Sequence, residues 1–229
     1  MPRLIALALI LAAPTALAQE QAAPAATTEV SAEAPAAAEA PAIDTVALAQ
    51  QLISQARADG VFDARPHDRA VLIRHRASGL LCRLSPDNAN RLIVFPQAAR
   101  GDDVACESID GPEVMRLYAT RYPFSTTLEQ QLSGAIEAMQ RQYATMSPLA
   151  VTIPADEDMP PSMTAQFTAT DAAGTRFYTR VSVAQFGPWT LKMRYTTPAA
   201  NDRHLTRGER VSSNVWASAL TNMRQRARS

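Results

Sequence analysis

The stretch MTAQFTATDAAGTRFYTRVSVAQFGPWTLKMRYT, residues 163–196, alternates apolar and polar side chains. Neighbouring side chains point to opposite faces of a strand, so the alternation predicts three strands joined by turns at 171–174 and 187–188. An apolar face opposite a polar one is typical of an antiparallel sheet that is covered on one side only. The residues expected on the covered face are Met163, Ala165, Phe167, Ala169, Phe177, Val181, Val183, Trp189, Leu191, Met193 and Tyr195.

Two helices are expected to cover this sheet. Thr126 and Glu129 match the capping-box pattern, and apolar residues then recur at helical spacing through residues 127–146. Residues 213–226 carry a second apolar stripe that includes Trp216 and Leu220. A further helix is expected from an Asp44 cap to about residue 57. The predicted fold class is therefore α+β, an antiparallel β-meander covered by helices.

Four short strands and a disulfide are expected between the first two helices. The strands are predicted over residues 70–76, 80–85, 91–95 and 104–109. Cys82 and Cys106 are the two cysteines of the chain, and in an oxidising compartment they favour a disulfide over free thiols or a redox pair. Bridged Cα atoms lie about 4.4–6.8 Å apart, so either the two strands are direct neighbours or Cys106 lies on a loop that folds over.

The first 43 residues are expected to precede the folded domain. Arg3, a short apolar run and Ala16-Leu17-Ala18 form the three parts of a cleavable secretory signal over residues 1–18. The alternative is an uncleaved membrane anchor, for which the apolar run is too short. Residues 19–43 are rich in Ala, Pro and Glu and contain no Lys or Arg, which predicts a disordered tether.

Residues 44–229 are expected to form a single α+β domain of an exported bacterial protein, periplasmic or secreted. The signal holds one Arg and the tether four Glu, which leaves this domain 21 basic and 18 acidic residues, a net charge of +3. This excess is too small to indicate a nucleic-acid-binding protein. After the signal, no segment reaches the ~20 apolar residues that a transmembrane helix requires.

The polar face of the meander is the candidate contact surface. Its predicted members are Arg176, Tyr178, Arg180, Lys192 and Arg194, with Arg180 expected opposite Arg194 and Ser182 opposite Lys192. Like charges placed opposite each other are unfavourable unless solvent screens them or an anion lies across them. The surface is therefore expected to bind an anionic partner: phospholipid headgroups, lipopolysaccharide phosphates, cell-wall carboxylates or an acidic protein. The alternative is an ordinary solvated sheet face.

The sequence predicts no catalytic residue, metal ligand or cofactor. His67, His75 and His204 have no partner at metal-ligand spacing, and there is no G-x-S-x-G nucleophile motif. The predicted role is a non-enzymatic accessory or binding protein of the cell envelope.

Two alternatives to this role stay open. One is an envelope hydrolase whose triad assembles from distant residues, which a polar pocket holding His67 or His204 beside a carboxylate would favour. The other is a carrier of a small hydrophobic ligand, which a cavity lined by Met139, Phe167 and Trp216 would favour.

The order of the helix at 127–146, the meander at 163–196 and the closing helix at 213–226 resembles the PsbP-like fold. This is an α/β/α sandwich found in extrinsic photosystem subunits and in small bacterial envelope proteins. The stretch YTRVSV at 178–183, with Gly187-Pro188-Trp189, is also similar to secreted proteins of alphaproteobacteria. The resemblance covers about half of the chain, implies a non-enzymatic accessory or binding role and transfers no site residues.

Overall fold

The computed structural model describes residues 43–149 and 160–227. The chain separates into two compact units, Met1–Ala40 and Pro41–Ser229, and the described residues belong to the second unit. The predicted signal at 1–18 and all but the last residue of the predicted tether at 19–43 lie outside the described residues.

The second unit contains three helices and ten strands in its described part, which confirms the predicted α+β class. In chain order the elements are α1 (Thr45–Gln55), β1 (Phe62–Arg65), β2 (Val71–His75), β3 (Leu81–Leu84), β4 (Ala89–Val94), β5 (Asp103–Asp110), β6 (Glu113–Thr120), α2 (Leu128–Gln140), β7 (Thr145–Pro148), β8 (Ser162–Thr170), β9 (Arg176–Phe186), β10 (Trp189–Pro198) and α3 (Asp202–Ala227).

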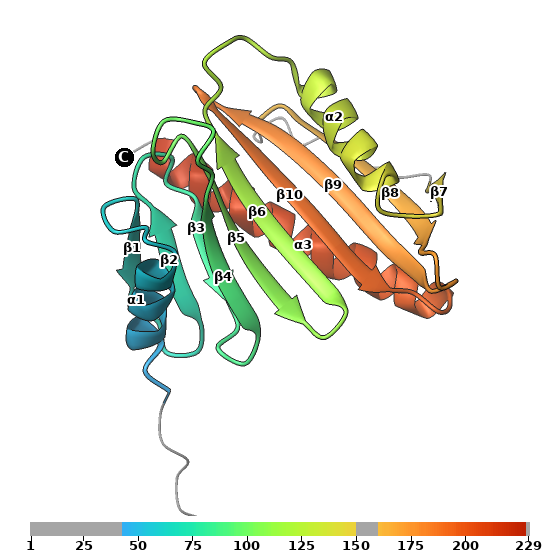
Figure 1. Ribbon diagram of the computed structural model, residues 1–229, viewed down its shortest axis with the longest axis horizontal. Helices are drawn as coiled ribbons and strands as arrows, with labels where there is room; N and C mark the ends of the chain where they lie inside the picture. Colours follow the sequence, from blue (N-terminus) through green and yellow to red (C-terminus); the bar gives the residue numbers. More distant parts are fainter. Residues whose placement is uncertain (1–42, 150–159, 228–229) are drawn as a thin grey trace, which may run out of the picture. The chain divides into compact units, whose positions relative to one another are not determined.

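A seven-stranded antiparallel sheet forms the centre of the unit (Figure 1). Its strand order is β4-β5-β6-β10-β9-β8-β7, so the predicted meander β8-β9-β10 is present and β10 pairs on its other side with β6. In the described chain, β1, β2 and β3 form a separate three-stranded sheet. The predicted strands at 70–76, 80–85, 91–95 and 104–109 correspond to β2, β3, β4 and β5.

The turn between β9 and β10 decides which side chains share a face of the large sheet. Only Gly187 and Pro188 separate the two strands, and Phe186 therefore pairs with Trp189. Residues with even numbers in β9 consequently lie on the same face as residues with odd numbers in β10. The prediction had placed Val181 and Met193 on one face, and this is wrong.

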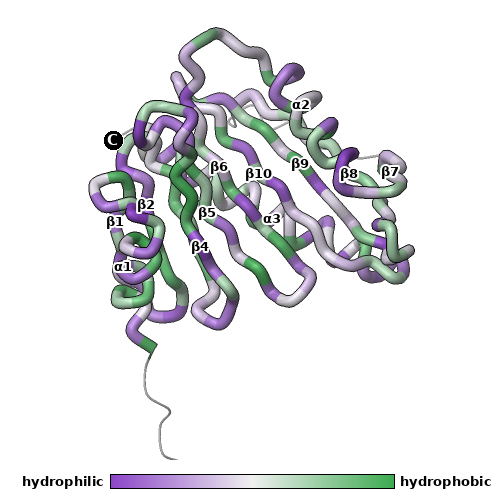
Figure 2. The backbone as a smooth tube through the Cα atoms, in the orientation of Figure 1, coloured by the Kyte–Doolittle hydropathy of each residue, from purple (hydrophilic) through white to green (hydrophobic). Residues whose placement is uncertain are grey.

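Helices cover both faces of the large sheet, which corrects the prediction of one covered side. On the first face α2 packs against β8 and β9, where Met139 and Ala135 contact Phe167 and Val181. On the second face α3 packs against β9 and β10, behind the sheet in Figure 1. We call the first side the α2 face and the second the α3 face. Figure 2 shows the matching alternation of hydrophilic and hydrophobic residues along β6, β9 and β10.

The helix ends differ from those predicted. Asp44 caps α1 as expected, accepting from the backbone N–H groups of Val46 and Ala47. The capping box of α2 is formed by Thr127 and Gln130, one residue later than the predicted pair Thr126 and Glu129. Residues 145 and 146, predicted as the end of the helix, belong to β7, and α3 begins eleven residues before the predicted 213.

The disulfide joins the two sheets and confirms the predicted pairing. Cys82 in β3 and Cys106 in β5 are both fully buried, with their Cα atoms 6.2 Å apart. Neither predicted arrangement is found, because Cys106 lies in a strand and the two strands belong to different sheets. His75 of β2 also contacts Trp189 of β10, so the small sheet packs on the α3 face. Within the described residues, no helix combines the length and the apolar character that crossing a bilayer demands.

Candidate functional site

The five residues predicted to form one surface lie on opposite faces of the large sheet. Tyr178 and Arg180 point to the α3 face, where they are 0% and 4% exposed. Lys192 and Arg194 point to the α2 face and are partly exposed, and Arg176 is exposed at the start of β9. The predicted surface is therefore divided in two: Lys192 and Arg194 of β10 lie together on the α2 face, and Arg176 is the exposed member on the other face.

The predicted cross-strand pairs are wrong by one residue. Arg180 lies opposite Tyr195, and Arg194 lies opposite Val181. Lys192 is likewise not opposite Ser182 but opposite the next residue of β9.

Arg180 fixes α3 to the sheet. Its guanidinium donates to the hydroxyls of Ser182 at 2.9 Å, Ser213 at 2.5 Å and Thr164 at 3.5 Å. Burial lowers the pKa of Arg180 below its ordinary value. These contacts satisfy the buried cation with hydroxyl groups from β8, β9 and α3, so Arg180 has a structural role.

The α2 face of β10, β6, β5 and β4 carries a row of charged residues across four strands. Arg194 lies opposite Arg116, Arg116 lies opposite Glu107, and Glu107 lies opposite Arg91. A like-charge pair is thus present, but it is Arg194 with Arg116 across β10 and β6, and the predicted pair of Arg180 with Arg194 is not found. Like charges in this arrangement are unfavourable for the sheet by a fraction of a kcal/mol.

Glu107 neutralises part of this row. The carboxylate is fully buried and forms ion pairs with Arg91 and Arg116. Arg116 also donates to the Tyr118 hydroxyl at 3.0 Å. Arg194 lies outside this cluster and donates to the Gln142 side chain at 3.0 Å. Two guanidinium groups therefore share one carboxylate, and the third has a neutral partner.

A second row lies beside the first. Lys192 is opposite Tyr118, with its Nζ atom 4.5 Å from the ring centroid, and Phe95 stacks on the same ring at 6.2 Å. This is a favourable cation–π contact. Among the described residues, no carboxylate lies within salt-bridge distance of Lys192.

Asp103 is an acidic residue whose charge acts on Lys192. Thr120 donates to its carboxylate at 2.7 Å. Burial raises the pKa of Asp103 and lowers the pKa of Lys192, and their mutual attraction opposes both shifts. Each group is thus shifted toward its neutral form, which is a common property of residues in functional sites.

We call this surface the open face, because in the described part of the chain no helix packs over β5 and β6 on the α2 face. In Figure 1 it lies at the front, beside α2. Four cationic side chains and two carboxylates give it an excess of two positive charges. Its members are Thr190, Lys192 and Arg194 of β10, Arg116, Tyr118 and Thr120 of β6, Asp103 and Glu107 of β5, and Arg91 of β4.

Seven of these nine residues were missed by the sequence prediction, three of them because β6 was not predicted. The alternation typical of a strand is nevertheless present in residues 113–120, EVMRLYAT, where Met115, Leu117 and Ala119 alternate with Arg116 and Tyr118. The short turn at Gly111 would have joined this strand to β5.

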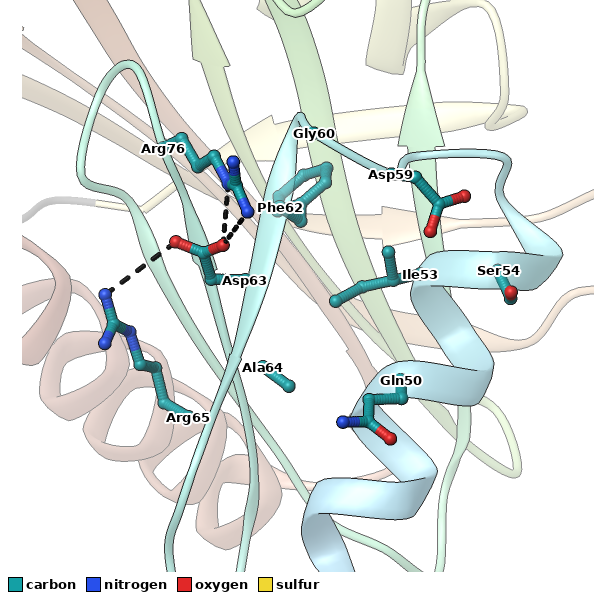
Figure 3. Close-up of a pocket in the computed structure, with 10 residues that line it drawn as sticks. All are labelled: Gln50, Ile53, Ser54, Asp59, Gly60, Phe62, Asp63, Ala64, Arg65 and Arg76. Atoms are coloured by element: carbon teal, nitrogen blue, oxygen red, sulfur yellow. Dashed lines mark hydrogen bonds and ion pairs between the residues drawn. The ribbon is translucent and has the colours of Figure 1, made fainter.

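A second candidate site lies beside α1 and the edge strand β1 (Figure 3). It is a depression of about 530 Å³ lined by residues that include Asp59, Asp63, Arg65 and Arg76. Asp63 forms ion pairs with Arg76 at 2.6 Å, Arg74 at 3.4 Å and Arg65 at 3.8 Å. The two aspartates and two arginines of the lining leave it without net charge, in contrast to the open face.

His75 does not form a hydrolytic site. Its Nδ1 atom lies 2.7 Å from the Ser78 hydroxyl and accepts from the Ser78 backbone N–H at 3.3 Å. Its ring contacts Phe62 and Trp189, and burial lowers its pKa to about 4. Ser78 is only 7% exposed, so this pair closes a buried turn and a substrate cannot reach the hydroxyl.

The other arrangements that would have favoured an alternative function are not found among the described residues. Neither His67 nor His204 lines any of four surface pockets of about 130–530 Å³. Met139 and Phe167 pack together on the α2 face, whereas Trp216 belongs to the core on the α3 face. No group of three or more His, Cys, Asp or Glu residues lies close enough to hold a metal ion in the described ranges.

Comparisons with known proteins leave the chain without an assigned family. No family model matches it, and no curated protein matches it either. The solved structures include a match to PA94 from Pseudomonas aeruginosa, a protein of unknown function, with 10% sequence identity and a TM-score of 0.36. That match covers 65% of this chain and 94% of PA94. The chain is therefore only distantly similar to PA94, and the similarity transfers neither a fold nor a function.

Proposed function

We propose that the chain is an exported, non-enzymatic binding protein of the bacterial envelope and that an anionic partner binds to its open face. One observation carries the proposal: Arg194 lies opposite Arg116, and Lys192 stands beside them without a carboxylate in contact among the described residues. A bound anion would turn this unfavourable arrangement of like charges into a favourable one.

The electrostatics of Lys192 support an anionic ligand. Burial lowers the pKa of this lysine because its ammonium group is partly removed from water. A phosphate or carboxylate in contact would replace the lost hydration and stabilise the charged form. The open face therefore gains more from an anion than a fully solvated basic surface would, because solvent screens exposed charges more strongly.

Export is supported by the buried disulfide between Cys82 and Cys106, since such bonds form and persist in oxidising compartments. The predicted signal at 1–18 points to the same destination. The resemblance to PsbP-like proteins implies an accessory role of this kind. A hydrolase and a small-ligand carrier are the alternative proposals. A polar pocket holding His67 or His204 would favour the hydrolase, and a cavity lined by Met139, Phe167 and Trp216 would favour the carrier. Neither feature is among those described above.

Sedimentation of the purified protein with isolated cell-wall sacculi and with phosphatidylglycerol vesicles tests the proposal. We expect the protein to bind at least one of them at low ionic strength and to be released when added salt shortens the Debye length to about 8 Å. The double variant Lys192→Gln/Arg194→Gln should weaken binding at least about tenfold, the equivalent of ~1.4 kcal/mol.

Arg176→Gln is the matched control, because Arg176 is exposed on β9 but does not belong to the open face. This variant should bind as wild type does. If wild type sediments with neither material, or if the control loses as much binding as the double variant, the proposal is wrong.

A further inference from the structure

A pocket of about 480 Å³ lies between the loop that follows β6 and the turn between β9 and β10. The loop contributes aromatic and proline side chains, and among them Phe124 is 66% exposed. Isolated exposed apolar residues need no explanation, but an exposed aromatic ring in a pocket wall is typical of a binding site. The pocket is lined by Tyr122, Pro123, Phe124, Ser125, Thr126, Gln185, Pro188 and Thr190.

This pocket borders the open face, because the two share Thr190. Thr190 lines the pocket and precedes Lys192 by two residues on the same face of β10, a separation of about 7 Å along a strand. Asp103 provides a second connection, because its charge acts on both Tyr122 and Lys192. A ligand of modest size that occupies the pocket can therefore reach the Lys192 ammonium group.

Contacts with α2 hold the aromatic side of the pocket, Tyr122 and Phe124, in place. The Tyr122 hydroxyl donates to the Gln131 side chain of α2 at 2.6 Å, and its ring contacts the Phe124 ring with centroids 5.7 Å apart. Gln131 in turn donates to the Thr126 hydroxyl at 2.6 Å. The loop is thus anchored to α2, and the exposed Phe124 ring is presented in a fixed position, which lowers the entropy lost on binding.

The pocket lining combines aromatic with hydroxyl and amide side chains, and this combination favours some classes of anion over others. A simple anion needs no aromatic wall, and a long acyl chain would meet the polar side chains of Ser125, Thr126 and Gln185. A sugar ring matches both properties, because its C–H faces pack on an aromatic ring while its hydroxyls bond to hydroxyl and amide side chains.

We propose that the anionic ligand of the open face is an acidic saccharide, whose ring packs on Phe124 while its carboxylate or phosphate reaches Lys192. The proposal rests on the proposed function of the open face and names the chemical class of its ligand. Both anions share the same contact with Lys192, and they differ in source: uronic acids carry carboxylates, and sugar phosphates carry phosphates.

Calorimetric titration of the purified full-length protein with four probes tests this proposal. Trigalacturonate and glucose 1-phosphate are the acidic sugars, maltotriose is a neutral sugar, and citrate is an anion without a sugar ring. We expect at least one acidic sugar to bind more tightly than both maltotriose and citrate. The better of the two acidic sugars identifies the anion.

Two variants separate the contributions of ring and charge. Phe124→Ala should weaken binding of the acidic sugar at least about fivefold and leave citrate unaffected, since an aromatic contact typically contributes a factor of this size. Lys192→Gln should weaken both. Ile43→Ala is the matched control, because Ile43 is the other large apolar residue exposed in the described chain, at 53%.

Different failures have different meanings. If citrate and the acidic sugars bind equally and Phe124→Ala changes neither, the saccharide proposal is wrong while the anionic open face stands. If maltotriose binds as tightly as the acidic sugars, the contact with Lys192 is wrong. If none of the four probes binds, the saccharide proposal falls, and the sedimentation experiment decides the proposed function by itself.

Discussion

Lowering the pH from 7.5 to 5 is expected to destabilise the protein through His75. The side chain is 1% exposed, and burial lowers its pKa from 6.5 to about 4. In the unfolded chain the same imidazole binds a proton below pH 6.5. Because the unfolded state then binds more protons than the folded state, the stability that is complete above pH 6.5 is lost as the pH falls toward 4.

The size of the effect follows from the two pKa values. At pH 5 the unfolded imidazole is almost fully protonated and the folded one is about one-tenth protonated, which corresponds to about 2 kcal/mol of unfolding free energy. With a urea m-value of about 2 kcal/mol/M, this moves the unfolding midpoint by about 1 M.

Urea unfolding followed by the fluorescence of the buried Trp189 and Trp216 measures this loss. The comparison is between wild type and His75→Phe, which keeps a ring against Phe62 and Trp189 but does not titrate. The variant has a lower stability at every pH because the Ser78 hydroxyl loses its contact with the imidazole and keeps only that with the Leu80 backbone N–H. Its loss between pH 7.5 and 5 should nevertheless be smaller than that of wild type by about 2 kcal/mol.

Equal losses in wild type and variant would refute this reasoning, since they would show that His75 binds protons equally in both states. An NMR titration gives an independent check. The ring resonances of His75 should stay nearly unchanged down to about pH 5.

Three substitutions test the packing. Replacing both Cys82 and Cys106 with alanine should lower the unfolding free energy by about 3 kcal/mol, because the bond closes a loop over a sequence separation of 24 residues; an unchanged urea midpoint would contradict this. Gly208→Ala should destabilise by about 1–3 kcal/mol, since its new Cβ would lie 2.8 Å from the Tyr178 ring. Gly134→Ala should instead stabilise by up to about 1 kcal/mol, because nothing lies within 4 Å of that position in α2. A melting temperature that rises for Gly208→Ala would contradict the first of these two glycine predictions, and one that falls for Gly134→Ala would contradict the second.

The strands of the meander could be predicted because alternation is a local property. Residues 163–170 and 189–196 read as strands without knowledge of their partners, and both are strands. The shared face could not be predicted in this way, because it depends on the number of residues in the turn. Reading Gly187-Pro188 as a two-residue hairpin turn would have placed Arg180 opposite Tyr195.

The helix ends were harder to predict than the helices. Tyr143 and Met146 continue the apolar spacing of α2, but the helix ends at Gln140 and residues 145–148 pair with β8 instead. Apolar residues at helical spacing fit the edge of this sheet equally well, so tertiary contacts decided the outcome. The first half of α3 is mostly polar because its apolar contact with the sheet is small, with Leu205 and Val211 packed on the core and Gly208 against Tyr178.

Arg180 and Lys192 show why composition alone did not locate the site. Both are basic residues in strands that contain no acidic residue. Arg180 can be buried because Ser182, Ser213 and Thr164 supply three hydroxyls around its guanidinium.

Lys192 remains partly exposed, and its neighbour across the strands is Tyr118, which offers a ring face but no carboxylate. That neighbour comes from β6, more than seventy residues earlier in the chain, and the pairing of β6 with β10 is a property of the whole sheet. The candidate site is thus produced by strand order, which brings an unpaired cation of β10 to the basic side of β6. Of the six charged residues that define the open face, β10 alone contributes two and β6 alone contributes one, so neither strand read by itself reveals the site.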